Sequence, residues 1–346
     1  MDRKYIGPLL FAAGLASTLC CDFLHALDPY VAQIIMYIGI NIIMTASLNI
    51  VNGYMGEFSV GHAAFMAVGA YMASFFSVSI FPHGPGSAVF FPLCLLAGGA
   101  AAALVGFLIA VPAFKARDDY LAIITLALIM ITKSVFENLP WFGGPQGYSG
   151  IQKYTNLSWV FVCATATVVV VRNLVNSTFG RGIIAVRDDE VAANLVSVNT
   201  KYVKVLAFVV SAFFAGVGGG LFAHLIQFIN PRTFSIIKST DFLLMLYLGG
   251  SGTLAGPILG AAIWTILLEL LRFLGIWRFV VAPVALIILM IYRPLGIMGG
   301  KDFGQLSWLK LKNKSNHPGL PDSLAPGPSP VNGRGEKGTG GKGVRE

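Results

Sequence analysis

The stretch AVFFPLCLLAGGAAAALVGFLIAV, residues 88–111, contains no charged side chain and decides the class of fold. As a helix it is about 36 Å long, which exceeds the roughly 30 Å hydrocarbon core of a bilayer. Similar apolar runs recur along the chain and predict spans near residues 6–27, 30–51, 60–81, 88–111, 120–139, 157–172, 203–229, 241–250, 256–272 and 277–292. The sequence therefore predicts an all-α, polytopic integral membrane protein with about eight to ten transmembrane helices, some of them interrupted.

The composition supports this class and excludes several others. Of the 346 residues, 55% are hydrophobic and only 12% are charged, and the mean hydropathy is +0.74. A typical soluble domain has about twice that share of charged residues, so an ordinary cytosolic enzyme and a disordered protein are both excluded. The cysteines all lie in apolar runs, without the spacing of a metal site or a disulfide framework, at Cys20, Cys21, Cys94 and Cys163. We expect no metal site and, since no cluster of catalytic side chains stands out, no enzymatic activity.

The net charge of +8 is distributed as in a membrane protein and not as on a nucleic-acid-binding surface. From Gly300 onward there are eight basic and four acidic residues, so half of the excess lies in the C-terminal tail. Other basic residues cluster at Lys115 and Arg117, at Arg181, Arg187, Lys201 and Lys204, and at Arg293 after the last span. The positive-inside rule places these clusters in the cytoplasm together with Arg3 and Lys4, and it places the loop 140–156 outside.

The chain is expected to form two regions. Residues 1–298 are predicted to be a transmembrane domain, and residues 299–346 a cytoplasmic tail. From about residue 313 the tail is rich in Pro, Gly, Ser and Lys, cannot bury apolar surface, and is expected to be disordered. Its glycines do not fit the phosphate-loop pattern G-x-x-x-x-G-K-[ST]. The glycines from Gly216 to Gly220 lie inside an apolar span, where small residues let helices approach closely.

Two glycine-rich segments interrupt otherwise apolar helices, NGYMGEFSVGH (52–62) and LGGSGTLAGP (248–257). Irregular backbone at membrane depth is tolerated only where it is buried in protein or lines a cavity. Paired interruptions in the two halves of a membrane protein point to a transport pathway. The alternative is an ordinary tight loop at the membrane surface. The candidate pathway residues are Gly53, Gly56, Glu57, Ser59, Gly61, His62, Gly249, Gly250, Gly252 and Gly256.

The short run 241–250 cannot cross a bilayer as a plain helix, because it is only about 15 Å long. Either it joins 256–272 as one broken pass, or it is a half-helix shielded by its neighbours. The charge distribution requires that it count as a crossing. Among the ionisable residues, only His224 and Glu269 look clearly internal, and for both a structural hydrogen bond outweighs a role with substrate. Several of the other ionisable residues lie within a turn or two of a span end, where long side chains reach water.

The longest loop between spans is FGRGIIAVRDDEVAANLVSVN, residues 179–199, within a connection of about 173–200. Charged and apolar residues alternate in it as in one or two amphipathic helical turns. Loops elsewhere are short, so an ordered helical loop of this length indicates a docking surface for a partner. A solvated linker helix is the alternative.

This loop resembles the coupling loop of ABC-transporter membrane subunits, whose core is Glu-x-Ala-Ala-x-x-x-Gly. Glu190, Ala192 and Ala193 match that pattern, and Ser197 stands at the position of the glycine. From about residue 30 to 298 the chain is similar to the branched-chain amino-acid ABC permease family, of LivM type. The stretches that carry the likeness are SLNIVNGYMGEFSVGHAAFMAVGAY (47–71), DDYLAIITLAL (118–128), GGPQG (143–147), KYVKVLAFVVSAFFAGVGGGLFAH (201–224) and LLMLYLGGSGTLAGPILGAA (243–262).

The resemblance implies an ABC importer permease fold in a multi-pass protein of the bacterial inner membrane. It also implies several partners: a homologous second permease, two cytoplasmic ATPases that hold ATP and Mg²⁺, a periplasmic substrate-binding protein and membrane lipid. No cofactor would be bound by this chain itself. The residues expected to couple it to the ATPase are Gly180, Arg181, Arg187, Asp188, Asp189, Glu190, Ala192, Ala193 and Ser197.

The implied function is ATP-driven import of leucine, isoleucine and valine. A related permease for urea, short amides or other amino acids is the alternative within the same class. A channel or secondary transporter would need a buried set of ion ligands or a ring of pore charges, and the sequence shows neither.

Overall fold

The computed structural model describes residues 28–80, 87–115 and 120–277, together with 280–281, 283–284, 287, 291–292 and 296–298. The described chain is helical apart from its loops and one isolated β-bridge between Tyr148 and Ile229. Its α-helices are α2 (Pro29–Asn49), α3 (His62–Phe75), α4 (Phe91–Ala113), α5 (Tyr120–Asn138), α6 (Leu157–Asn176), α7 (Thr178–Asp188), α8 (Glu190–Leu195), α9 (Thr200–Ile226), α10 (Ile236–Gly249) and α11 (Ala255–Leu270). A π-helical turn, η1 (Ile50–Met55), continues α2.

Seven helices of the described part are long and apolar enough to cross a membrane. This confirms the prediction of an all-α polytopic protein. The predicted span 6–27 and the tail 299–346 lie outside the described residues, and half of the span 277–292 lies outside them.

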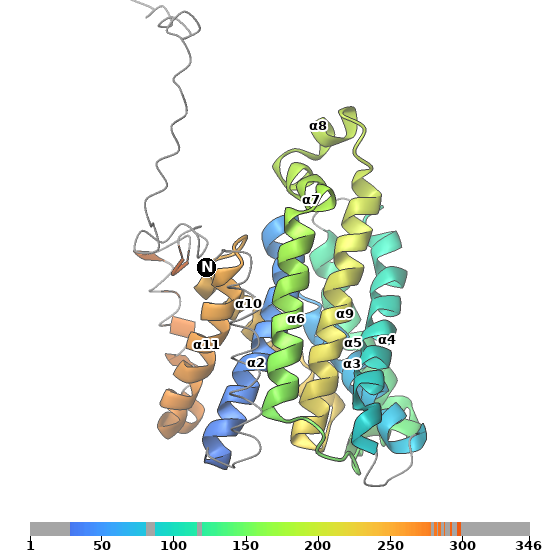
Figure 1. Cartoon of the computed structure of the whole chain (residues 1–346), viewed down its shortest axis with the longest axis vertical. Helices are drawn as coiled ribbons and strands as arrows, with labels where there is room; N and C mark the ends of the chain where they lie inside the picture. The colour runs from blue at the N-terminus through green and yellow to red at the C-terminus, as the bar shows by residue number, and fades with distance from the viewer. Residues whose placement is uncertain are drawn as a thin grey trace, which may run out of the picture. The chain divides into compact units, whose positions relative to one another are not determined.

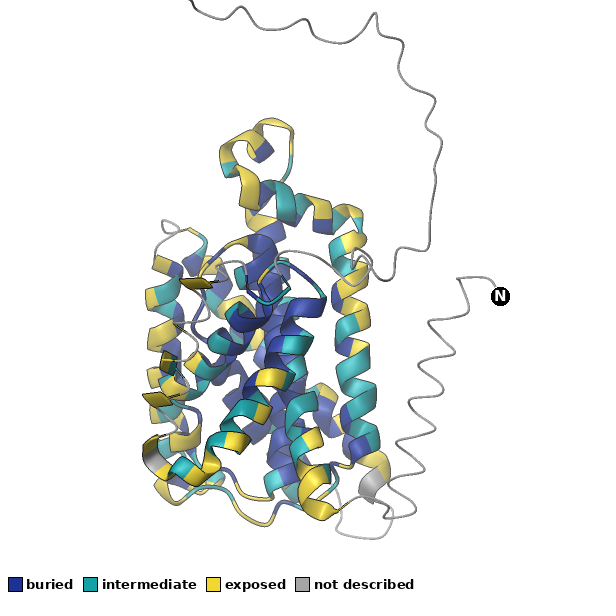
Figure 2. Ribbon diagram, turned by 90° about the vertical axis from the view of Figure 1, so that its left-hand side faces the viewer, coloured by how far each residue is buried: buried dark blue, intermediate teal, exposed yellow. Residues whose placement is uncertain are grey.

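Helix α9 forms the centre of the bundle and packs against α2, α3 and α4 (Figure 1). Figure 2 shows buried residues along the middle of the bundle and exposed ones on the helices at its edges. The outer faces of α4 and α5 are apolar and exposed, as at Leu104, Phe107 and Ile123. Apolar side chains on the outside are expected where lipid, and not water, is the solvent.

Small residues permit the close packing of α3 against α9. A Cβ atom built on Gly69 would lie 2.2 Å from the backbone oxygen of Gly216, and one on Gly219 would lie 2.0 Å from that of Met66. Both distances are far below van der Waals contact, so only glycine fits at these two crossings. The interpretation of Gly216–Gly220 as a helix-packing stripe is thereby confirmed.

Helices α10 and α11 form an antiparallel hairpin. Gly249 lies against Gly256, and Met245, one turn earlier in α10, lies against Gly260, one turn later in α11. The two helices therefore run in opposite directions. This pairing excludes a single broken pass and identifies α10 as a half-helix, about 21 Å long. The N–H of Ile297 donates to the Leu248 oxygen over 3.0 Å, so the chain has returned to the same end of the bundle by residue 297.

Replacing Gly69 with valine is expected to loosen the α3–α9 contact. The added carbons meet backbone atoms of α9 that cannot rotate away, and overpacking of this kind costs about 1–3 kcal/mol. Thermal unfolding of the detergent-purified protein would show a lower midpoint. Gly182→Ala is the matched control, because its Cβ would lie 3.7 Å from the nearest atom. An unchanged midpoint for Gly69→Val would contradict the packing described here.

Candidate functional site: a junction at one end of the bundle

The expected helical loop consists of two helices that stand beyond one end of the bundle (Figure 1). Ser177 caps α7 by accepting the Gly180 N–H over 3.1 Å, and Asp189 caps α8 by accepting the Ala192 N–H over 3.0 Å. Capping side chains of this kind fix where a helix begins. The connection between α6 and α9 is therefore an ordered projection, α7–α8.

A lysine in α9 joins this projection to the first interrupted segment. Lys204 Nζ lies 2.6 Å from Glu57 Oε1 and 2.8 Å from Glu190 Oε2. The lysine and Glu57 are buried, and about a third of the Glu190 side chain is exposed. Charges are rarely buried unless they are paired, and here one ammonium group binds two carboxylates from different parts of the chain.

A second contact to the same segment comes from Arg187 at the end of α7. Its Nη1 donates to the backbone oxygen of Gly53 over 3.3 Å, and its Nη2 lies 3.2 Å from Asp188 Oδ1. A Cβ on Gly56 would lie 2.5 Å from Arg187 Cγ, and Gly56 has a φ of 78°, which favours glycine. The arginine therefore packs directly on the interrupted backbone.

The segment between η1 and α3 runs non-helically into the bundle. Glu57 contacts Lys204, whereas His62 at the start of α3 lies 3.4 Å from the Ser211 hydroxyl. Lys204 and Ser211 are seven positions apart in α9, which is about 10 Å along the helix. The segment is therefore no tight surface loop: Gly56 and Phe58 are exposed, and from Ser59 onward the irregular backbone is buried in the protein.

Side chains of neighbouring helices satisfy this backbone. The N–H of Val60 donates to Thr125 Oγ1 over 3.1 Å, and the Val60 oxygen accepts from Ser239. Asn52 accepts the Ser59 N–H over 3.3 Å and donates to the Ser59 oxygen over 3.2 Å. Irregular backbone at membrane depth requires such partners.

The two interrupted segments meet each other. Asn49 accepts the Gly252 N–H over 2.9 Å and donates to the Thr253 oxygen over 2.8 Å. A Cβ atom added to Gly252 would lie 3.6 Å from Arg187 Nη1, so this turn also approaches the arginine. We call this assembly the junction: the segment 52–62, the turn 250–254, Arg187, Glu190 and Lys204.

The remaining candidate pathway residues lie in or next to the junction. Within the segment 52–62, Ser59 is buried and Gly61 packs against Thr125. His62 is buried, with its Nε2 3.1 Å from the Ser47 hydroxyl. Gly249, Gly250 and Gly256 form the tight approach of α10 to α11.

Glu57, one of the candidate pathway residues, is buried. Its side chain is only 10% exposed, because the backbone carries it inward to Lys204. Lys204, placed by sequence among the solvated loop charges, is 6% exposed. Neither residue's neighbours in the sequence reveal this pairing, which joins positions 147 residues apart.

Of the two residues expected to be internal, one is and one is not. His224 is buried, its Nδ1–H donates to the Gly220 oxygen over 2.8 Å, and its ring packs against Tyr154 and Phe91. This contact agrees with a structural role. Glu269 is about one-third exposed and pairs with Arg272 Nη1 over 3.0 Å, because α11 lies at the edge of the bundle.

Apart from Asn194, the exposed residues of α8 are apolar. Val191, Leu195 and Val196 are 72%, 82% and 73% exposed, whereas Ala193 is buried against the chain itself. The sequence pattern had drawn attention to the charged residues, of which Arg187 and Glu190 are engaged within the protein. The sequence did offer one sign of this patch: apolar residues follow Asp189, a residue type that caps helices, in a charged loop.

Ser197 ends α8 in a strained conformation. Its φ is 66°, the left-handed region that a glycine adopts without cost. The departure from the glycine of the coupling-loop pattern therefore preserves the turn but leaves it strained.

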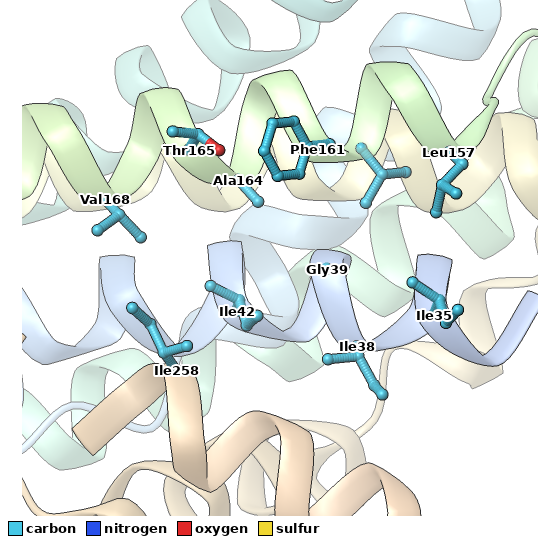
Figure 3. A pocket seen from close by; sticks show the side chains of 11 residues that line it. Ile35, Ile38, Gly39, Ile42, Leu157, Phe161, Ala164, Thr165, Val168 and Ile258 are labelled. Carbon is cyan, nitrogen blue, oxygen red and sulfur yellow. The ribbon is translucent and has the colours of Figure 1, made fainter. Parts of the chain in front are cut away.

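The described residues contain no group of three or more His, Cys, Asp or Glu side chains able to hold a metal ion. A groove of about 360 Å³ lies between α2, α6 and α11. Figure 3 shows it lined by apolar side chains such as Ile42, Phe161 and Val168. It contacts none of the junction residues, so it is no part of the candidate site.

Comparison with known proteins identifies the family. A family profile described as "Branched-chain amino acid transport system / permease component" matches residues 30–292. The high-affinity branched-chain amino acid transport system permease protein LivM of Escherichia coli (strain K12) is 30% identical over 294 residues, covering 75% of this chain and 68% of LivM. LivM of Salmonella typhimurium matches with the same identity and coverage. No solved structure matches the chain.

A shorter match involves another kind of import system. The autoinducer 2 import system permease protein LsrC of Photorhabdus luminescens is 32% identical over 127 residues, which cover 34% of this chain and 38% of LsrC. All three relatives are membrane permeases by name. The chain belongs to the family of permease components of branched-chain amino acid transport systems and is a multi-pass transport protein of the LivM type.

Replacing Ser197 with glycine is expected to stabilise the end of α8 by about 1 kcal/mol, because the strain of the left-handed conformation disappears. Amide hydrogen exchange in α8 would become slower. Ser134→Gly, in the middle of α5, is the matched control and is expected to destabilise by about 0.5–1 kcal/mol. Faster exchange in the Ser197→Gly protein would contradict this account of the turn.

Proposed function

We propose that this chain is the membrane-spanning permease subunit of an ATP-driven ABC importer for branched-chain amino acids. The observation that carries the proposal is the ordered projection α7–α8, which bears an exposed apolar patch, binds the first interrupted segment through Arg187 and approaches the second at Gly252. The family membership supports the substrate class. The importer would lie in the bacterial inner membrane, with the projection and the C-terminal tail in the cytoplasm.

The energy for import would come from separate subunits. The sequence lacks the phosphate-loop pattern, and uptake against a gradient requires a partner that binds the inward- and outward-open states unequally. Two cytoplasmic ATPases holding ATP and Mg²⁺ would fill this role. A homologous second permease and a periplasmic binding protein would complete the transporter.

The patch formed by Val191, Leu195 and Val196 is the surface we assign to the ATPase. Exposed apolar clusters on a projection away from the membrane-facing helices mark protein–protein contacts. Ala192 and Asp188 are exposed and lie within a few residues of the patch in sequence, so they can add contacts at its rim. Arg181, in the first turn of α7, is exposed as well. The buried Ala193 supports α8 from beneath.

A related substrate remains the alternative. The similarity to LsrC shows that part of the chain is shared with a permease named for autoinducer 2 import. Urea, short amides and other amino acids are therefore tested beside the branched-chain amino acids.

Replacing Leu195 with glutamate is expected to release the ATPases. Placing a charge in the centre of an apolar contact leaves it desolvated, so binding should weaken at least tenfold. The measurement is the amount of ATPase that co-purifies with the tagged permease. Trp141→Glu, at an exposed apolar residue in the loop between α5 and α6, is the control and should retain the ATPases. Full retention by Leu195→Glu would refute the assignment of the patch.

In vesicles that contain the whole transporter, ATP-dependent uptake of labelled leucine is expected to be inhibited by excess isoleucine and valine. Branched aliphatic side chains of similar size differ by only about 1–3 kcal/mol in an apolar site. Competition by urea, with none by valine, would replace the proposed substrate with the alternative. Uptake without nucleotide would contradict the ABC class.

A further inference from the structure

The buried lysine at the junction suggests how movement reaches the interior of this chain. We infer that Lys204 is a positioning residue that couples the projection α7–α8 to the buried segment 52–62, through Glu190 on one side and Glu57 on the other. The inference rests on the proposed function, because it assumes that an ATPase moves the projection.

The geometry places the lysine between two parts that lack a covalent connection nearby. Glu190 is the first residue of α8, and Glu57 lies in the non-helical segment that leads to α3. Both carboxylates are within 2.8 Å of the same ammonium nitrogen. A displacement of α8 therefore pulls on Lys204 and Glu57 directly.

Burial makes this connection stiff. Lys204 is 6% exposed, and its ammonium group also lies 5.9 Å from the centre of the Phe114 ring at the end of α4. Ion pairs that are shielded from water are screened little and are not readily exchanged for hydration. A solvated pair on the surface would separate under the same displacement.

The segment that receives the displacement connects the end of η1 to the start of α3. It is non-helical from Gly56 to Gly61, and it is held to its neighbours by side chains such as Thr125 and Asn52. Its far end is the start of α3, where His62 contacts Ser47 of α2 and Ser211 of α9. Hinges in proteins are commonly a few such residues at the ends of helices.

Arg187 provides a parallel contact. It binds the Gly53 oxygen from α7, on the same side of the segment. Loss of the Lys204 connection should therefore weaken coupling without abolishing it.

The two links through Lys204 act in series, and this makes the inference testable. Glu57→Gln and Glu190→Gln each keep the size and a hydrogen-bond acceptor but remove the charge. Each is expected to lower leucine uptake per ATP hydrolysed about tenfold, the effect of a coupling free energy in the usual range for neighbouring residues. Because breaking either link disconnects the series, the double variant should be no worse than the single ones.

The experiment uses the complete transporter in vesicles and measures uptake, ATP hydrolysis and the amount of ATPase bound per permease. Glu137→Gln is the matched control, since it removes one carboxylate of the Lys133–Glu137 pair on α5, away from the junction. The Lys204→Arg variant should retain most of the coupling, because a guanidinium group can also bind two carboxylates.

Three results would overturn the inference. One is unchanged uptake per ATP in both single variants, and another is a double variant whose losses multiply, as independent structural effects do. The third is a fall in uptake that matches the loss of bound ATPase. If the wild-type transporter itself binds no ATPase or needs no ATP, the proposed function fails instead, so the two failures are distinguishable.

Discussion

The ammonium group of Lys204 is the point on which the organisation of this end of the molecule depends. It is buried beside α9, and its charge is balanced by carboxylates from the segment 52–62 and from α8. Removing one member of such a buried pair leaves an uncompensated charge, which typically costs about 3–5 kcal/mol. The two ion pairs therefore hold the three elements together, and the position of the projection α7–α8 is tied to that of the segment 52–62.

The second constraint is the need to satisfy irregular backbone away from water. The segment from Gly56 to Gly61 forms no helix, and its polar groups are bound by Asn52, Thr125 and Ser239. Asn49 does the same for the turn between α10 and α11. A helix would satisfy itself and could lie anywhere in the bilayer, whereas these segments are fixed by their partners. Such backbone can change position only when several helices change together.

Glycine has different uses in the two halves of the bundle. Between α3 and α9, Gly69 and Gly219 allow backbones to touch, and this contact makes a rigid centre. At the junction, Gly56 supplies a left-handed turn and room for Arg187. The α3–α9 contact therefore serves as a scaffold that holds the membrane domain together. The junction is a contact region whose side chains reach the projection α7–α8.

The all-α membrane fold, the helical projection and the two interruptions could be predicted from the sequence alone, because they follow from local hydropathy, from the amphipathic pattern of residues 179–199 and from glycine content. It also indicated the family, through motifs that are contiguous in the chain. The burial of Glu57 and its pairing with Lys204 became visible only in the folded chain, because the two residues meet across 147 positions of sequence. The partial exposure of Glu269 depends on the place of α11 in the bundle, and the return of α10 along α11 depends on the contacts of Gly249 with Gly256 and of Gly260 with Met245. No hydropathy or motif pattern of the sequence encodes these arrangements.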